Sequence, residues 1–504
     1  MKFFLKVKDA FFNVFIYKCI LLVFLIPTLL TPAVSFNYQL LFVMLGWGAV
    51  LCLHDLITHR KFLRAPGMLW LLGFLVVFIA TVILNYRTNL SGNVAVFGYT
   101  VIALLLLYPD HCSGDKKRIT AELFTLNSIF ICMTTILSTV SLCMFACKFC
   151  KILYFDGRKF VIGWYQNRLY GMYKNMAYMT SAIGLALIAI QFTVIKARGG
   201  CKKWYKALLI YTAVVNFCSM CMENAKGAFI SLAVFVAVFA FYSMLRAMIR
   251  RNRKWFVAVC TSLTVMLVSA AVLLGAVYTS RQILAYVPSI YSMVTYDPPA
   301  TEPTQPNKPS DPATPTDPTT PSVPNQGIVK EEVDREVPNN FGVLTGRPKI
   351  WKYGIDQFKL KPLLGHGPSS HNGTKVLEAG ITHFHNLIIQ SLVSVGIVGS
   401  ICIAIFFIRR ILIAMIALWK RIGEDNVYIP VCIGLISLIG MFMVNSMSEV
   451  TVLFQARFSV FLFWMMLGYL SSLLDYEIRK EDKLMARVAN WIDSKFKKAK
   501  KNEK

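Results

Sequence analysis

The residues best suited to chemistry in this 504-residue chain lie between positions 346 and 399. In chain order they are Arg347, Trp351, Gly365, His366, Gly367, His383, His385 and Asn386. An imidazole, whose ordinary pKa is near 6.5, can accept a proton at neutral pH. A guanidinium can bind phosphate oxygens through paired donors. Together they offer a proton acceptor beside cations that can bind an anionic substrate.

A stripe of polar residues follows the histidines. Asn386, Gln390 and Ser394 recur every four residues on an otherwise apolar predicted helix. Polar groups within a membrane face protein or water, so we expect this stripe to face inward, toward a cavity, with His385 at its outer mouth. The simpler alternative makes Asn386 only the N-cap of that helix. His366 and His371 are expected to be solvated loop residues, with the alternative that the Gly365–Gly367 turn brings His366 near the site.

The helices that must position these residues are evident from hydropathy. A mean hydropathy of +0.55 with 56% hydrophobic residues indicates an all-α polytopic membrane protein. We predict about twelve transmembrane helices and one long extracytoplasmic loop. The predicted spans are 11–33, 37–56, 66–85, 93–109, 120–147, 176–195, 207–223, 228–245, 255–278, 386–408, 427–445 and 456–474. The first lacks a small-residue cleavage site after its apolar core and should anchor the chain.

These spans divide the chain into four parts. Residues 1–278 hold the first nine helices, 279–385 the outer loop, 386–474 the last three helices, and 475–504 a tail. The loop contains a Pro/Thr-rich segment, 298–324, with ten of the twenty prolines, which predicts an extended spacer. Apolar residues at helical spacing predict that the tail is a basic amphipathic helix on the inner leaflet. Most of the thirteen cysteines lie within predicted spans and should pack as small apolar residues.

The basic residues orient the predicted protein. Most of the 53 Lys and Arg residues fall at the two termini and in alternate short loops. That side should be the cytoplasm, with both termini on it. The net charge of +27 then reflects topology and contact with anionic membrane lipids. No nucleic-acid-binding motif is present, so we expect no nucleic acid partner.

Cations on the opposite side are more informative, because the orientation rule does not place them there. The connection between the fifth and sixth spans contains Lys148, Lys151, Arg158, Lys159, Arg168 and Lys174, with Asp156 as its one acid. Lys226 lies just before the span 228–245, at the outer end of a predicted helix hairpin, and Lys349 and Lys352 follow Arg347. Contact with lipid headgroups could explain each cation singly. As a group they favour an anionic substrate such as a diphosphate.

Three motifs in order resemble the O-antigen ligase / polysaccharide polymerase (Wzy) family of bacterial envelope enzymes. The main one runs from Arg347 and Trp351 through Gly365-His366-Gly367 and His385-Asn386 to Gly396-Ile397-Val398-Gly399. Upstream, Arg168-Leu169-Tyr170-Gly171 with Asn175-Met176-Ala177 is similar to the family's R-x-x-G…N-x-x-A element. Ala225-Lys226-Gly227-Ala228 is similar to its Ser-Arg-Gly-Ala element, with Lys in place of the usual Arg. The resemblance covers roughly residues 160–470.

The resemblance implies a metal-independent glycosyltransferase without cofactors, in the bacterial plasma membrane, with its active site on the extracytoplasmic face. It would move a glycan from undecaprenyl diphosphate to a hydroxyl of a glycan or lipid acceptor, and a chain-length regulator could be a further partner. By position, His385 would be the general base, with His383 as the competing candidate. Arg347, Arg168, Lys226 and Arg158 would serve the diphosphate, and Asn386, Trp351, Gly365 and Gly367 would support the site. Lys226 is a point charge and cannot make the paired contact of Arg.

Several functions stay open at this point. The Pro/Thr-rich loop and basic tail favour a polymerase of capsule, exopolysaccharide or O-antigen. An O-antigen ligase acting on lipid A core and a protein glycosyltransferase are the alternatives within the family. A polysaccharide transporter or flippase is the alternative of another class. The sequence shows no internal repeat between its halves, and its unusual charges cluster at the outer face, which favours an enzyme.

Overall fold

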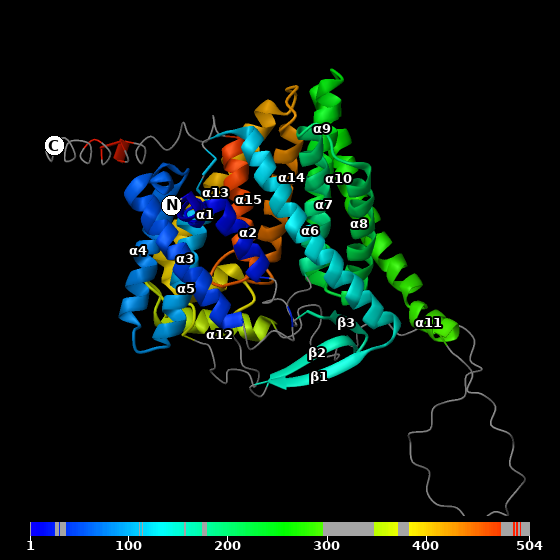
Figure 1. The fold of residues 1–504 in the computed structure, drawn as a ribbon, viewed down its shortest axis with the longest axis horizontal. Coiled ribbons are helices and arrows are strands. Elements are labelled where there is room, and N and C mark those ends of the chain that lie inside the picture. The colour runs from blue at the N-terminus through cyan, green and yellow to red at the C-terminus, as the bar shows by residue number, and fades with distance from the viewer. Residues whose placement is uncertain are drawn as a thin grey trace, which may run out of the picture.

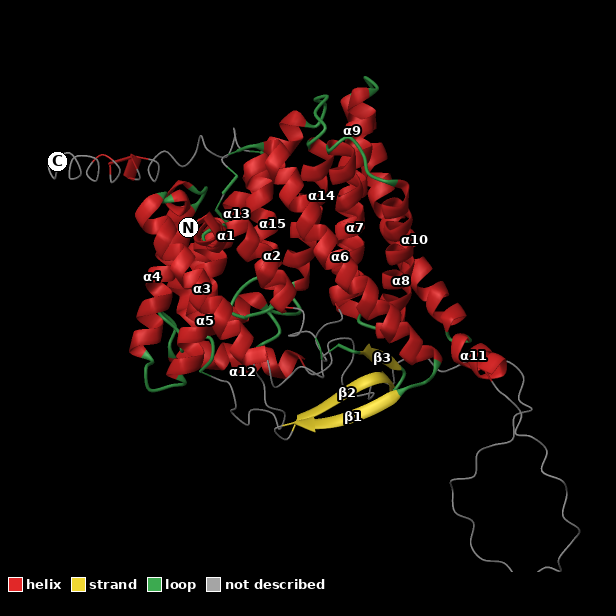
Figure 2. Cartoon of the chain, in the orientation of Figure 1, coloured by secondary structure: helices red, strands yellow, loops and turns green. Residues whose placement is uncertain are grey.

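The computed structural model describes residues 2–25, 30, 37–109, 111–112, 114–155, 158–173, 179–295, 347–370, 383–474, 487–488, 490–491 and 494. Within these ranges the chain forms a bundle of helices with a small sheet at one end (Figures 1 and 2). The predicted spacer 298–324, His371, Lys174, the segment 175–177 and most of the predicted tail helix lie outside the described residues.

Eight described helical stretches are long and apolar enough to cross a membrane. They are formed by α3 (Asn37–Thr58), α5 with η4 (Leu90–Ile102, Ala103–Leu107), α6 (Lys116–Ala146), α7 (Met179–Ala197), α8 (Lys203–Glu223), α9 (Lys226–Arg250), α10 with α11 (Trp255–Leu284, Val287–Thr295) and α13 (Leu387–Arg421). Shorter apolar helices are α2 (Val14–Leu25), α4 (Met68–Leu84), α14 (Ile429–Asn445) and α15 (Phe458–Leu473). The polytopic helical class is therefore confirmed, and each predicted span overlaps one of these helices. The exact number of crossings stays a prediction, because the shorter helices have only 10–17 residues.

The remaining described helices are shorter or polar. They are α1 (Lys2–Phe11), η3 (Lys61–Arg64) and α12 (Arg347–Leu360). The predicted Arg-Trp segment of the outer loop is thus helical, since Arg347 and Trp351 both lie on α12. Helix α12 lies at the end of the bundle opposite the turn between α9 and α10 (Figure 1).

A three-stranded sheet corrects the all-α prediction. Strands β1 (Cys150–Phe155), β2 (Arg158–Tyr165) and β3 (Arg168–Gly171) form an antiparallel sheet in the order β1-β2-β3. Gln166 and Asn167, both with positive φ, make the two-residue loop between β2 and β3, as tight hairpins require. The many Lys and Arg residues of this segment suggested only an irregular connection, and its hairpin loop lacks the usual glycine. The sheet and α12 lie at the same end of the bundle (Figure 2).

Helix α15 forms the centre of the helical core, and all of its residues are buried. Trp464 contacts the rings of Tyr108, Phe406 and Phe407, at centroid distances of 5.7, 5.5 and 5.6 Å. Its indole N–H donates to the carbonyl of Val452, at 2.9 Å. Aromatic packing with a satisfied indole is rigid, so this contact fixes the segment between α14 and α15, which supplies a site residue.

Candidate functional site

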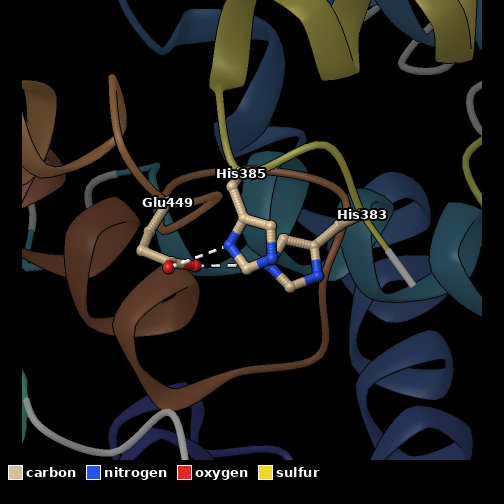
Figure 3. Close-up of side chains that lie close together, drawn as sticks. All are labelled: His383, His385 and Glu449. Carbon is tan, nitrogen blue, oxygen red and sulfur yellow. Dashed lines mark hydrogen bonds and ion pairs between the residues drawn. The ribbon is translucent and has the colours of Figure 1, made fainter. Parts of the chain in front are cut away.

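Two histidines that precede α13 and one acid that follows α14 meet in the folded chain (Figure 3). His385 Nδ1 is 2.9 Å from Oε1 of Glu449, and His383 Nε2 is 3.2 Å from Oε2 of the same carboxylate. The two imidazole rings lie 4.0 Å apart, centroid to centroid. Glu449 is only 5% exposed and His383 3%. The two imidazoles that sequence reasoning left as rivals therefore share one buried carboxylate.

Arg347 joins this group from the first residue of α12. Its Nη2 is 3.2 Å from Oε1 of Glu449, the oxygen that also contacts His385. The side chains of Arg347 and His385 are 23% and 21% exposed, so both border the surface. The expected base and the expected diphosphate ligand are thus joined through Glu449. That residue was absent from the sequence prediction.

The loop after α14 holds Glu449 in place. The amide of Glu449 donates to the carbonyl of Asn445, at 2.8 Å, and continues the last turn of α14. The amide of Leu387 donates to the carbonyl of Ser446, also at 2.8 Å, and Asn386 Nδ2 donates to the carbonyl of Met447, at 3.0 Å. These bonds join the start of α13 to the end of α14. The joint brings His385 and Glu449 together although 64 positions separate them.

The charges of the group follow from its contacts. Burial acts to raise the pKa of Glu449, but the hydrogen bonds from His383 and His385 outweigh it and hold that pKa well below its usual range. Burial lowers the pKa of His383 to about 4, although its bond to Glu449 acts in the opposite direction. We infer an ionised Glu449 beside a neutral His383. Because a carboxylate can only accept, a neutral His385 bonded to it carries its proton on Nδ1 and its lone pair on Nε2.

The backbone at His385 is strained. Its φ of 51° lies in the left-handed region, which a residue other than glycine seldom adopts. The next residue, Asn386, returns to extended backbone and caps α13. Strain of this kind persists where the surrounding contacts enforce it, and here the joint to the α14 loop supplies them.

Two residues of the polar stripe of α13, Gln390 and Ser394, are buried, whereas Asn386 is partly exposed. The groups of the stripe bond to protein, and a cavity beside it stays a prediction. Asn386 Oδ1 accepts from the amides of Ile388 and Ile389, so the N-cap interpretation of this residue is confirmed. Gln390 Oε1 accepts from the amide of Phe384, and Gln390 Nε2 donates to Ser394 Oγ. The stripe therefore holds the segment that carries both histidines.

Gly365 and Gly367 belong to a loop that pairs with a break in α13. At Gly396 the helix has φ 65° and ψ −171°, which frees its neighbouring backbone groups. The amides of His366 and Gly367 donate to the carbonyls of Val393 and Ser394, at 2.8 and 2.9 Å. In return the amide of Ile397 donates to the carbonyl of Pro362, at 2.8 Å. A broken helix at membrane depth needs such partners.

Gly365 and Gly367 are required because the loop passes too close to α13 and to Asn93 to leave room for a Cβ atom. A Cβ added at Gly365 would lie 2.6 Å from the carbonyl oxygen of Val393, and one at Gly367 would lie 2.7 Å from Asn93. The hairpin of α4 and α5 holds the other side of the loop. Thr81 Oγ1 donates to the carbonyl of Leu364, at 2.6 Å, and Asn85 Nδ2 donates to that of Gly365, at 3.1 Å. Both glycines support the site through this loop.

His366 differs from its prediction as a solvated residue. It is half-buried, and its Nε2 lies 2.9 Å from the carbonyl of Gln357 on α12. Burial lowers its pKa. It thus ties the loop to α12, the helix that carries Arg347. Trp351 lies one turn after Arg347 and is partly buried, with an indole nitrogen that has no hydrogen-bond partner among the described residues.

The remaining predicted cations come from β2, β3 and α9. Arg168 starts β3, and its Nε donates to the backbone carbonyl of Glu223, at 2.9 Å. Lys226 is exposed at the first position of α9, three residues further on. No hydrogen bond among the described residues joins either cation to His385. Arg158 starts β2, and its side chain lies outside the described part of the chain.

Close packing links the start of α9 to the histidine group. A Cβ added at Gly227 would lie 3.4 Å from Ser448 Oγ, one residue before Glu449. Asn445 Nδ2 donates to Ser231 Oγ, one turn into α9, at 3.1 Å. Lys226 therefore starts a helix whose first turn packs on the loop that carries Glu449.

Sequence reasoning missed Glu449, although one signal was available. Between Val427 and Leu474 it is the single acidic residue, between two strongly apolar segments. A lone acid in such a place is a functional candidate on energetic grounds. Arg457 was also missed, and it lies near enough to His383 to favour the neutral imidazole. Both residues follow α14, outside the motif that drew attention to the outer loop.

Comparison with known proteins finds a similarity over part of the chain. Residues 211–404 match the family model described as O-antigen ligase. The matched segment contains Lys226, Arg347, His383 and His385, and it lies between Arg168 and Glu449 in the chain. No curated protein matches the chain.

Proposed function

We propose that this chain, a membrane glycan transferase of the O-antigen ligase / polymerase family, moves a glycan from undecaprenyl diphosphate to an acceptor hydroxyl. The observation that carries the proposal is the contact of Glu449 with both His385 and Arg347. It joins a base for the acceptor to a cation for the leaving group. The reaction needs both parts at the same anomeric carbon.

His385 acts as the general base. With its proton on Nδ1 and directed to Glu449, its Nε2 can accept the proton of the acceptor hydroxyl as the new glycosidic bond forms. The imidazolium that results is stabilised by the Glu449 carboxylate, 2.9 Å away. A buried carboxylate that fixes the tautomer of a histidine has this role in other enzymes. His383, which is neutral, holds the second carboxylate oxygen and is a positioning residue.

The cations act on the leaving diphosphate. As the bond between the anomeric carbon and the phosphate oxygen breaks, its electron pair stays with the diphosphate. Arg347 offers donors beyond the one that faces Glu449, and Lys226 is exposed at the start of α9. Arg168 and Arg158 belong to the sheet at the same end of the bundle (Figure 1). Fixed cations suffice to stabilise this charge, so we propose a reaction without a metal ion or cofactor. A single displacement would invert the anomeric configuration.

The reaction takes place on the extracytoplasmic face of the bacterial plasma membrane, with both termini in the cytoplasm. In support, the site lies at the end of the bundle opposite the basic turn between α9 and α10 (Figure 1). A chain-length regulator would act on the same face.

We propose a surface-polysaccharide polymerase, whose acceptor is a second lipid-linked repeat unit. The Pro/Thr-rich segment 298–324 and the basic tail favour it over an O-antigen ligase acting on lipid A core or a protein glycosyltransferase. A polysaccharide flippase is the candidate of another class. It has less support, because the site joins a base to cations at one end of the bundle.

The test is transfer by purified protein from a synthetic undecaprenyl-diphosphate oligosaccharide, in EDTA. Parallel reactions offer a second lipid-linked repeat, lipid A core or a Ser/Thr peptide as acceptor. We expect a lengthened lipid-linked product, lost in the variants His385→Ala and Arg347→Ala. Wild-type thermal unfolding of both variants would show that they fold. Full activity of either variant would refute its assigned role, and glycan translocation without transfer would favour the flippase.

A further inference from the structure

The group at Glu449 also has the composition of a transition-metal site. His383 and His385 each offer one ring nitrogen and Glu449 one carboxylate oxygen, and these three ligand atoms lie within 4.8 Å of one another. Two imidazoles and a carboxylate are a common protein ligand set for zinc, with water in the fourth position. Among the described residues no other group of three such side chains is placed this closely.

The ligand atoms lie close enough together for one ion to bind all three residues once the side chains adjust. In a tetrahedral zinc site, neighbouring ligand atoms are about 3.3 Å apart. Here His385 Nδ1 is 2.9 Å from Glu449 Oε1, and His383 Nε2 is 3.2 Å from Oε2, the other oxygen of the carboxylate. One ligand atom from each of the three residues lies within 4.8 Å of the other two. A zinc ion could therefore replace the two hydrogen bonds with small side-chain movements. The partly exposed side of His385 would leave room for a water ligand.

We propose that His383, His385 and Glu449 form an inhibitory zinc site. The metal site rests on this geometry alone, whereas the inhibition rests on the proposed function. To bind zinc through the nitrogens that face Glu449, each imidazole must move its proton to its other ring nitrogen. No proton is lost overall. His385 then carries its proton on Nε2, the atom that should receive the acceptor proton, so the base is blocked.

The Arg347 guanidinium should lower the affinity of the site for zinc. Its guanidinium already lies 3.2 Å from Glu449 Oε1, and a zinc ion must displace it. Because the Arg347 side chain is 23% exposed, it can turn toward solvent. Displacement also removes a cation from the leaving group, which adds to the inhibition. The bound diphosphate donor would hold Arg347 and should therefore compete with zinc.

The first experiment measures zinc binding to the purified full-length protein by calorimetry. Cys147→Ser and Cys150→Ser are introduced first, because these exposed thiols could bind zinc themselves. We expect one bound zinc ion, and affinity at least about tenfold lower in His383→Gln and Glu449→Gln. Magnesium, which prefers oxygen ligands, should not bind there and serves as the control ion. Equal zinc affinity in all three proteins would refute the site.

The second experiment measures glycan transfer as free zinc is raised to saturation and then removed with EDTA. We expect at least about tenfold loss of activity and full recovery, and weaker inhibition at high donor concentration. Activity that is unchanged or raised at saturating zinc would overturn the inhibition. Zinc binding by a protein that transfers no glycan from any donor would refute the proposed function while leaving the metal site in place.

Discussion

Glu449 contacts three site residues at once: His383, His385 and Arg347. A histidine near a membrane surface can exist in two tautomers, and rotation of its ring costs little. The carboxylate selects the tautomer with the proton on Nδ1 and fixes the ring. It also lies beside a cation, so its own burial is tolerated. At the scale of single residues, the proposed transfer reaction would therefore depend on Glu449 as much as on His385.

Glu449→Gln tests this dependence. The amide keeps the shape of the side chain but can donate to His385 Nδ1, which favours the wrong tautomer. We expect kcat to fall by about 10²- to 10⁴-fold with a much smaller change in KM. The matched control is Glu424→Gln, at an exposed acid that pairs with Arg421. A kcat within about twofold of wild type for Glu449→Gln would contradict the role of the carboxylate.

The lowered pKa of His383 should make the free energy of unfolding depend on pH. Burial lowers its pKa from 6.5 to about 4, so between these values the unfolded chain binds more protons than the folded protein. Its contribution is fully present above pH 6.5 and is lost as the pH falls toward 4. The loss is up to about 3 kcal/mol. We expect the thermal midpoint to drop over this range, and to drop less in His383→Gln. The exposed His59 gives the control variant His59→Gln, which should behave like wild type.

The break in α13 is the decisive feature at the scale of elements. The loop 361–370 restores the backbone hydrogen bonds that the break at Gly396 removes, and the hairpin of α4 and α5 holds the loop. His366 then connects this loop to α12, where Arg347 lies. The position of Arg347 thus depends on a contact between two membrane helices and a loop.

Gly396→Ala should damage this arrangement. Its φ of 65° is costly for alanine, and the new Cβ would collide with the carbonyl of Leu363. We expect a destabilisation of about 1–3 kcal/mol from backbone strain alone, together with loss of transfer activity. Gly275→Ala in α10 is the control, because no atom lies within 4 Å of the added Cβ. That change should leave activity intact and thermal stability equal or higher. If Gly396→Ala and Gly275→Ala had the same thermal stability, the requirement for glycine at position 396 would be contradicted.

At the scale of the whole molecule, cations from distant parts of the chain gather at one end of the bundle. Arg168 comes from β3 and Arg347 from α12, two elements that lie at this end (Figure 1), and Lys226 is the first residue of α9, next to Gly227, which packs on Ser448. Glu223 fixes Arg168 through its carbonyl, and the chain reaches Lys226 three residues later. A substrate with two phosphates could bridge such a set.

Lys226 allows a test of the proposal that one diphosphate binds to Arg168, Lys226 and Arg347 together. We expect Lys226→Ala to lower kcat/KM for the lipid-linked donor by about 10- to 100-fold, the cost of one charged hydrogen bond. Lys226→Arg should keep most of the activity, because Arg also carries the charge. Lys203→Ala, at the first residue of α8 and far along the helix from Glu223, serves as the control. The shared site would be ruled out by a Lys226→Ala variant with unchanged donor kinetics.

The sequence by itself determined the helical membrane class, the approximate helix positions and the choice of His385, Arg347 and Lys226 as candidates. Hydropathy and charge are local properties that a run of about twenty residues displays in full. The motif histidines were likewise visible, because both lie beside the start of an apolar helix.

Only the tertiary structure decided which residue pairs with the proposed base, His385. Glu449 lies 64 positions after His385, and the two meet because backbone bonds join α13 to the loop after α14. The sheet β1–β3 and the pairing of loop 361–370 with the break at Gly396 also emerged only from the fold. Such contacts depend on which distant backbone groups lack partners, and this becomes defined only when the helices have packed.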